Sequence, residues 1–567
     1  MTDNNQNNLN NQNNGNLPTP TVAPVLQASP SGGVVAVLQP GQPGFDDKIR
    51  AESERKDNFV YQAGAPNTNR GETAQIELPQ VSEGEGNAAA AAAQESSKDA
   101  PPTTVLNYKI GNDLQKKQKT KWFVPVILGA LGLFIAGTLG FYFYNRSMEK
   151  QRQAIETVPA ETVITTLEYW GLWEPSQMLT TVLKDFETAN PGISVNYIKK
   201  DINGYREALQ SAIATTSGPD VFRYHASWRS YLAPNLETMP ETVMTTAQFG
   251  QEFYPVMSEQ LKNAEDQIQG MPLMYDSLAI LYNKDLYQEA GLETPKTWNE
   301  FRANAVALTQ KNTDGSIEVA GAALGLADNI DFVPDIIGLL AVQSGADLAA
   351  PETNIISDVL TFYTNFYNSE TQRTWDETFD SSTNAFARGE VAMILAPSWL
   401  IHDIWGINPD LNVGVASVPQ LDEDNPKEWA TYWVEGVSAN SPRQEAAWKL
   451  LAYLSSEEVL QALYEEQDSV RLFGEIYPRP SMADLLATDP YAQPYLFRAS
   501  AAVGYPLNDK TFDNALDDAN KDATRRAINS LTIERRGNSD NLSSATSQLI
   551  NSWHKNFIEY GYLIEQE

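Results

Sequence analysis

The stretch VITTLEYWGLWEPSQMLTTVLKDFETANPGISVNYI, residues 163–198, decides the fold class. Its opening, residues 163–170, alternates between apolar and polar side chains, which predicts a β-strand. Pro175 then begins a segment whose apolar residues recur at helical spacing, and the Asn-Pro-Gly sequence at 190–192 ends it. Residues 193–198 alternate again and predict a second strand. A strand, a helix and a strand in this order predict two parallel strands covered by the helix.

The same rhythm continues along the chain. Residues 205–214 predict a helix, and 217–225 predict a turn followed by a third strand. This β-α-β-α-β order is typical of an α/β domain, with a mainly parallel sheet covered by helices on both faces. Ligands of such sheets bind at the carboxyl ends of the strands. Further helices are expected at 445–454, 513–531 and 543–560.

Residue Thr297 begins another predicted helix. The sequence Thr-Trp-Asn-Glu at 297–300 is a capping box, in which the threonine and the glutamate each bond the backbone of the other. Apolar residues follow at Phe301, Ala305 and Leu308. We therefore expect an amphipathic helix from this point.

Composition excludes several kinds of site. The 567 residues contain no cysteine, which excludes disulfides, thiolate metal sites and cysteine nucleophiles. The net charge of −33 disfavours nucleic-acid binding, because an acidic surface repels phosphate backbones. The acidity could also favour a cationic ligand, but most of these charges are expected on a solvated surface.

The region before the α/β pattern predicts a membrane anchor. Residues 1–108, rich in Asn, Gln, Pro, Gly and Ala, predict a disordered cytoplasmic tail. A basic juxtamembrane segment, 109–121, precedes WFVPVILGALGLFIAGTLGFYFY at 122–144, whose 23 uncharged residues are long enough to span a bilayer. The excess of lysine before this helix favours a cytoplasmic N-terminus. Residues 145–160 predict a stalk, and 161–567 an extracytoplasmic domain at the plasma membrane.

Several segments of the outer domain resemble the family 1 extracellular solute-binding proteins, the group that includes maltose-binding protein, in that family's own order. The segments are TLEYWG (166–171), SGPDVFRY (217–224), GMPLMYDSLAILYNKDLYQEAGLETPKTWNEF (270–301), FARGEVAMILAPSWL (386–400), WVEGVSANS (433–441), AAWKLLAYLSSEEVLQALYEE (446–466) and GEIYPRPSM (474–482). Members of this family are receptors for ATP-binding-cassette importers. The uncleaved anchor and long tail depart from the usual secreted or lipid-anchored form.

The resemblance implies an α/β, two-lobed, periplasmic-binding-protein-like (type II) clamp with a hinge. It implies a first lobe of about 161–275 and 437–475, and a second lobe of about 276–436 and 476–567. The ligand would lie in the cleft, and contacts made to both lobes at once would drive closure.

Sugars present hydroxyls around a weakly apolar ring face, so their sites need flat aromatics and directional hydrogen-bonding groups. Candidates of both kinds follow predicted strands or stand at the crossings that the resemblance implies. They are Trp170, Trp173, Glu174, Tyr224, His225, Trp228, Asp276, Trp399, Tyr432, Trp433, Glu435 and Arg479.

Each candidate also has a structural interpretation. Trp170 and Trp173 could pack against the following helix. The resemblance gives Asp276 the role of an acidic hydrogen-bonding residue and Trp399 that of a ring-stacking residue, but the first could cap hinge backbone and the second could be core. Arg479 could brace the hinge by an ion pair.

Three functions follow from these observations. The leading one is reversible binding of a small solute, predicted to be a carbohydrate, for delivery to importer permease subunits. The second is an anchored sensor or scavenging receptor. The third is a carbohydrate-active enzyme, since paired carboxylates are abundant. The chain has only three histidines, at no metal-ligand spacing, and neither a nucleophile elbow nor a phosphate loop. We therefore expect no catalysis, cofactor or metal.

Overall fold

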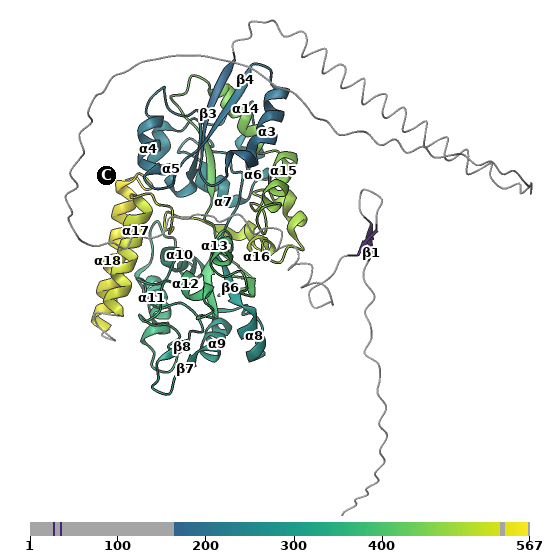
Figure 1. Ribbon diagram of the computed structural model, residues 1–567. Coiled ribbons are helices and arrows are strands. Elements are labelled where there is room, and N and C mark those ends of the chain that lie inside the picture. Colours follow the sequence, from purple (N-terminus) through teal and green to yellow (C-terminus); the bar gives the residue numbers. More distant parts are fainter. Residues whose placement is uncertain (1–25, 29–33, 37–163, 533–538, 565–567) are drawn as a thin grey trace, which may run out of the picture. The chain divides into compact units, whose positions relative to one another are not determined.

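The computed structural model describes residues 26–28, 34–36, 164–532 and 539–564 (Figure 1). The basic segment, the transmembrane helix and the stalk, predicted within 109–160, lie outside the described residues and stay predictions. Within the described ranges no helix is long and apolar enough to cross a bilayer. The tail predicted to be disordered contains one described pair of antiparallel strands, β1 and β2, in which Gln27 is opposite Val35.

Thirteen strands lie in the described residues, and most of them are short. They are β1 (Leu26–Ala28), β2 (Val34–Ala36), β3 (Thr165–Gly171), β4 (Ile193–Lys199), β5 (Val221–His225), β6 (Ala279–Asn283), β7 (Gln310–Lys311), β8 (Ile317–Val319), β9 (Met393–Ala396), β10 (Val413–Ser417), β11 (Glu428–Trp429), β12 (Trp433–Val437) and β13 (Ala502–Val503).

Helices connect these strands. The α-helices are α3 (Ser176–Ala189), α4 (Tyr205–Ile213), α5 (Arg229–Leu232), α6 (Thr246–Glu252), α7 (Pro255–Leu261), α8 (Lys284–Ala290), α9 (Trp298–Leu308), α10 (Val333–Gln343), α11 (Thr353–Asn368), α12 (Ser382–Ala387), α13 (Leu400–Ile407), α14 (Gln444–Leu454), α15 (Glu457–Asp468), α16 (Gln493–Leu496), α17 (Leu516–Leu531) and α18 (Ser539–Glu559). The short 3₁₀ helices are η1 (Ala226–Trp228), η2 (Ala233–Asn235), η3 (Pro480–Leu486) and η4 (Ala499–Ala501).

The first lobe is built on a sheet of order β12-β5-β3-β4. Strands β3, β4 and β5 are parallel, which confirms the predicted β-α-β-α-β unit. Helix α3 places Met178, Leu179, Val182, Leu183 and Phe186 on its buried face, the residues whose spacing predicted it. Helices α3 and α14 lie beside this sheet (Figure 1).

Strand β12 enters the first sheet earlier than predicted. It pairs antiparallel with β5, with Trp433 opposite His225 and Glu435 opposite Arg223. The sequence placed residues up to 436 in the second lobe, whereas backbone pairing joins 433–437 to the first sheet. The crossing between the lobes therefore precedes Trp433.

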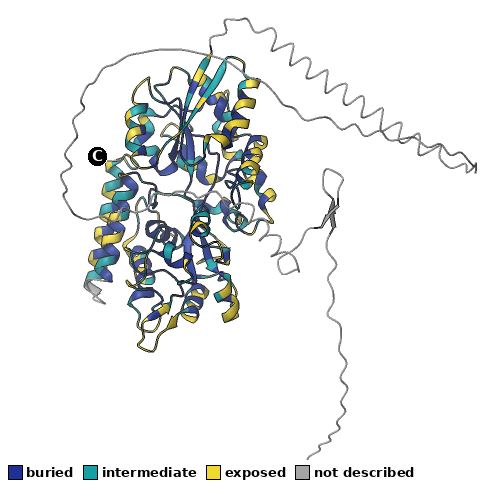
Figure 2. Ribbon diagram, in the orientation of Figure 1, coloured by how far each residue is buried: buried dark blue, intermediate teal, exposed yellow. Residues whose placement is uncertain are grey.

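The second lobe contains a smaller sheet of order β10-β6-β9. Both pairs in it are antiparallel, unlike the mainly parallel sheet that the sequence predicted. Helices α10, α11, α17 and α18 pack on one another in this lobe. Buried residues concentrate on the strands and on the inward faces of the helices of each lobe (Figure 2).

The crossings between the lobes are hydrogen-bonded to one another. Ser277 bridges to Ala430, and the Ala430 amide donates to the Val503 carbonyl at 2.9 Å. The Tyr275 amide donates to the Ile476 carbonyl at 2.8 Å, so the segment at residues 474–482 lies beside the first crossing, which contains residues 274–277. Because each crossing is held by its neighbours, the side chains between them have fixed positions.

Two short sequence motifs outside the crossings are part of regular helices. Thr297 accepts a hydrogen bond from the Glu300 amide at 3.2 Å, and the Glu300 carboxylate accepts from the Thr297 amide at 3.1 Å. This confirms the capping box at the start of α9. The run Asp518-x-Asn520-x-Asp522, which begins like a calcium loop, lies within the regular helix α17.

Candidate ligand-binding cleft

A cavity lies where the two lobes and their crossings meet. The first lobe contributes Trp173, His225 and Trp433 to its lining, and the second contributes Phe332, Pro397 and Trp399. The remaining lining residues come from the crossings and from a C-terminal segment: Met274, Asp276, Thr431, Tyr432, Glu475, Asp509, Lys510, Thr511 and Phe512. A ligand in this cavity would contact both lobes at once, as a hinged clamp requires.

Aromatic rings form much of the first-lobe lining. The Trp433 ring packs edge to face against Trp173, His225 and Trp228, with centroids 5.6, 5.2 and 5.2 Å away. Three neighbours of this kind fix the position of Trp433. On the second-lobe side Trp399 packs edge to face against Phe332, with centroids 5.8 Å apart. The cavity therefore offers aromatic surfaces from both lobes.

His225 is a neutral hydrogen-bonding group in this lining. Its Nδ1 shares a hydrogen bond with the Ser227 hydroxyl at 2.7 Å, and its Nε2 shares one with the Thr431 hydroxyl at 3.2 Å. Burial lowers the pKa of His225 to about 3. The ring is therefore uncharged at neutral pH, and it links β5 to the crossing that precedes β12.

Asp276 places a carboxylate beside the cavity from within the first crossing. It accepts hydrogen bonds from the Ser398 amide at 3.0 Å, the Ser398 hydroxyl at 2.9 Å and the Ser277 amide at 2.8 Å. Burial raises its pKa to about 7, although these donors act in the opposite direction. Asp276 thus caps hinge backbone, the structural role considered for it, and also holds the loop before Trp399 against the crossing.

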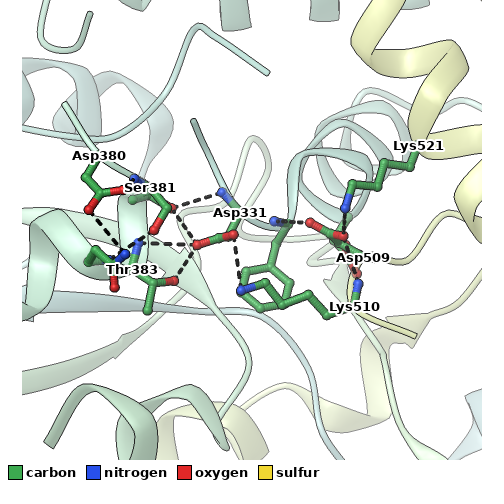
Figure 3. Close-up of polar contacts among 11 residues, drawn as sticks. Asp331, Asp380, Ser381, Thr383, Asp509, Lys510 and Lys521 are labelled. Carbon is green, nitrogen blue, oxygen red and sulfur yellow. Dashed lines mark hydrogen bonds and ion pairs between the residues drawn. The ribbon is translucent and has the colours of Figure 1, made fainter. Parts of the chain in front are cut away.

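Two residues of the C-terminal segment that line the cavity, Asp509 and Lys510, form ion pairs (Figure 3). The Lys510 ammonium lies 3.1 Å from the Asp331 carboxylate, which also accepts from the Thr383 hydroxyl. Lys521 pairs with Asp509, and the Asp509 carboxylate accepts from the Phe332 amide at 3.0 Å. Burial acts to raise the pKa of Asp331, but Lys510 and Thr383 outweigh it, so that pKa is lowered. Each charge here has a partner of opposite sign or a hydrogen-bond donor.

Residues 508–518, which we call the bridging segment, bond to both lobes. Toward the second lobe, the Asp509 amide donates to the Asp335 carboxylate at 2.8 Å. Toward the first lobe, Arg206 donates to the Asp513 carbonyl at 2.6 Å and the Ser227 hydroxyl donates to the Asp517 carboxylate at 2.5 Å. Movement of one lobe relative to the other must therefore rearrange this segment.

The backbone near the bridging segment is strained. Lys510, Phe512 and Asn514 have φ angles of 57°, 56° and 46°, and Phe332 has a φ of 61°. Non-glycine residues in this region cost about 1–3 kcal/mol each, and they persist where surrounding contacts hold them in place. Three of these residues line the cavity. Such strain is a common feature of ligand-binding positions.

Half of the predicted site residues line the cavity: Trp173, His225, Asp276, Trp399, Tyr432 and Trp433. The structure brings these six together from segments far apart in the sequence. Their contact with a ligand stays a prediction.

Two of the other candidates belong to a buried ion-pair cluster. Arg223 lies 2.6 Å from the Glu174 carboxylate and 2.6 Å from the Glu435 carboxylate. Tyr169 donates to Glu435 at 2.7 Å. This triad of two acids and one base lies inside the first lobe, and its residues are absent from the lining of the cavity.

The remaining candidates also have structural contacts. Trp170 donates to Glu168 at 2.6 Å and carries the Lys200 ammonium over its ring. Tyr224 donates to the Gln269 carbonyl at 2.9 Å. Trp228 is fully buried beneath Trp433. Arg479 pairs with Glu252 at 2.5 Å and donates to the Ser455 carbonyl at 2.8 Å, the bracing role considered for it.

Sequence reasoning missed the rest of the lining: Met274, Phe332, Pro397, Thr431, Glu475 and the 509–512 stretch. The 509–512 stretch has no glycine to indicate its unusual backbone. Met274 and Thr431 could have been predicted from the sequence, because they lie within two positions of residues already selected at the crossings. Glu475 is held at 2.8 Å by Arg471, which lies just beyond the end of α15 and which sequence spacing alone does not single out.

Comparison with known proteins decides the family. A family described as "Bacterial extracellular solute-binding protein" matches residues 181–498, more than half of the chain. The chain belongs to this family. Extracellular solute binding is therefore its class of function, and the two-lobed architecture with a cavity at the crossings is the corresponding geometry.

Individual relatives have low sequence identity to this chain but match it over a large part of its length. A periplasmic-binding protein of Sinorhizobium fredii, named for an amino-acid ABC transporter, is 22% identical over 51% of this chain and 68% of its own length. The multiple sugar-binding protein of Streptococcus mutans is 21% identical over 62% of this chain and 82% of its own. The structure of a sugar-binding protein from Xanthomonas citri shares the fold, with a TM-score of 0.56 at 21% identity, over 71% of this chain and 100% of its own.

Proposed function

We propose that this solute-binding protein holds a sugar or an oligosaccharide between its lobes and releases it unchanged to an ATP-binding-cassette importer. The observation that carries the proposal is the cavity lined by Trp173 and Trp433 from one lobe and Trp399 from the other, with the Asp276 carboxylate beside them. Flat rings suit the apolar faces of a pyranose, and carboxylates accept hydrogen bonds from its hydroxyls.

The named relatives support a sugar more than another solute. The Streptococcus mutans relative is named for sugars, and solved structures that share the fold contain α-D-tagatose in a protein from Thermotoga lettingae and maltotetraose in a maltodextrin-binding protein. The Sinorhizobium fredii relative is named for amino acids, so amino acids are the second class to test. The family and these relatives are binding proteins, which supports binding without turnover.

Isothermal titration of the full chain in detergent with mono- and oligosaccharides, polyols and amino acids tests the proposal. We expect saturable binding of one sugar class and recovery of that sugar unaltered. Trp399→Ala is expected to raise Kd by about tenfold, since loss of a stacked ring costs on the order of 1 kcal/mol beyond the lost contact area. Binding of amino acids alone would leave a clamp but remove the carbohydrate.

Trp405→Ala is the matched control. Trp405 lies on α13, is half-buried like Trp399, and donates to the Leu411 carbonyl at 3.1 Å, but it does not line the cavity. We expect it to bind the sugar as the parent does. An equal loss of affinity in both variants would mean that Trp399 acts through the fold and not by contact.

The proposal includes a single membrane anchor at residues 122–144, with residues 161–567 outside the cytoplasm. The uncharged run of 23 residues and the excess of lysine before it support this topology. The full chain should stay with membranes through alkaline extraction, and protease added to spheroplasts should remove the C-terminal domain. Release by alkali would refute the anchor while leaving the binding proposal intact.

A further inference from the structure

A second cavity lies near the crossings and shares no lining residue with the first. Its volume is about 340 Å³. Helices η1, α5 and α7 of the first lobe form one part of its lining, and the segment at residues 502–506 and Tyr562 form the rest. The volume is within the range of small-molecule sites, which begins at about 300 Å³.

Arg229 gives this cavity an unusual charge. The residue is half-buried, and desolvation lowers its pKa from the ordinary arginine value. Across the described part of the chain its guanidinium has no carboxylate within ion-pair distance and no hydrogen-bond acceptor. Two other shielded arginines have such partners, since Arg223 pairs with two glutamates and Arg443 with Asp220, whereas Arg302 stacks on the Phe362 ring. Because a partly buried cation is costly without a counter-ion, Arg229 is a position where an anion would be stabilised.

Uncharged polar groups beside Arg229 are also unsatisfied. The Ser230 hydroxyl and the Gln260 side-chain oxygen are buried without a hydrogen-bond partner in the described residues, and both residues line the cavity. Gln260 lies against Gly504, where an added Cβ would come within 2.3 Å of its amide nitrogen. Rotation of the amide lets either of its ends face the cavity. A guanidinium, a hydroxyl and an amide together supply donors suited to an oxyanion.

The acidic side chain in the lining opposes an anion only weakly. Glu259 is 76% exposed and lies 3.8 Å from the Lys262 ammonium, so its charge is both hydrated and partly neutralised. Tyr562 adds a half-buried hydroxyl close enough for the Arg229 charge to act against the rise in its pKa that burial causes. Arg229 and Glu259 give this lining one charge of each sign, and Arg229 is the more shielded from solvent, so its charge is the less screened.

We propose that this second cavity, lined by Arg229, Ser230, Gln260 and Tyr562, binds a small oxyanion, either a phosphate or a carboxylate group. The guanidinium is the counter-ion, and the serine hydroxyl and glutamine amide orient the oxygens. This site shares no lining residue with the aromatic cavity.

The test is thermal unfolding of the full chain in detergent, in a dilute buffer without phosphate. Inorganic phosphate and acetate are titrated separately, each at ionic strength held constant with sodium chloride. A ligand that binds only the folded state raises the melting temperature with a saturable dependence on concentration. We expect this response for at least one anion, with the larger response assigning the site to phosphate or to carboxylate groups.

Variants locate the response. Arg229→Gln should abolish it, and Ser230→Ala should weaken the apparent affinity several-fold with the guanidinium intact. Arg302→Gln is the matched control, because desolvation also lowers the pKa of Arg302, which stacks on Phe362 in the second lobe. That variant should keep the response. The inference is overturned if neither anion exceeds chloride, if Arg229→Gln still responds, or if Ser230→Ala binds as the parent does.

Discussion

Replacement of Arg223 by methionine should strongly destabilise the first lobe and should do so through charge. Arg223 is 4% exposed and holds two carboxylates, Glu174 at 6% and Glu435 at 1% exposure. Methionine fills a similar volume but leaves both carboxylates inside the lobe without a counter-ion. Removal of one partner from a buried ion pair costs about 3–5 kcal/mol, because the remaining charge stays desolvated. We expect the free energy of unfolding to fall by an amount in this range at pH 7.5.

The pH dependence separates charge from packing. In the parent protein, burial acts to raise the Glu174 pKa, but the Arg223 charge outweighs it, and the net pKa is lowered. A lowered pKa contributes stability above the unfolded value of about 4.3, and this is lost as the pH falls through the folded pKa. In Arg223→Met the largest cause that lowers the Glu174 pKa is gone, and burial is opposed only by a backbone hydrogen bond and the Arg471 charge, so the Glu174 carboxyl binds a proton more readily. The difference in unfolding free energy should therefore narrow between pH 7.5 and pH 5.

Urea unfolding followed by circular dichroism at several pH values measures these differences. The matched control is the triple variant Glu174→Gln, Arg223→Met, Glu435→Gln, which removes all three charges. We expect it to lie within about 2 kcal/mol of the parent, because neutral replacement of a buried ion-pair cluster is often nearly neutral. A constant difference at every pH, or a triple variant as unstable as the single one, would refute the electrostatic reasoning.

Other substitutions test the cleft and the second lobe. Burial raises the pKa of Asp276 to about 7, so the folded protein holds a proton that the unfolded chain releases near pH 3.9. The free energy of unfolding therefore falls as the pH rises between these two values, by up to about 1.36 kcal/mol per pH unit. Urea unfolding of Asp276→Asn should lack this fall. Lys510→Met removes a charge that helps to outweigh burial in lowering the Asp331 pKa, and it should lower the free energy of unfolding by about 1–3 kcal/mol at pH 7. The stability contributed by this ion pair is present above about pH 3.9 and is lost as the pH falls. An equal loss of stability at pH 3 would contradict this account. Gly338→Ala places a Cβ 2.3 Å from the Trp429 ring and should lower the melting temperature, at a cost of about 1–3 kcal/mol, whereas Gly406→Ala, with open space around it, should be neutral or stabilising; the same change in both would exclude the steric explanation.

The sequence determined the elements and the fold class, because those depend on local spacing. The apolar period of 176–189 predicted helix α3, and the residue types at 297–300 predicted the capping box of α9. The order of the first strands predicted a parallel sheet, which the first lobe has. The segments that resemble solute-binding proteins indicated the family, and half of the candidate site residues chosen from the sequence line the cavity.

Tertiary structure alone decided which polar residues face the cavity. Glu174 and Glu435 stand beside aromatics in the sequence, as ligand-binding acids would, but each pairs with Arg223, which is 49 and 212 residues away along the chain. The bridging segment gave no local signal either, since Asp509 contacts Phe332 across 177 residues and its backbone angles are imposed by contacts with both lobes. Local patterns record which faces are apolar, whereas the partner of a buried charge is set by how distant segments pack.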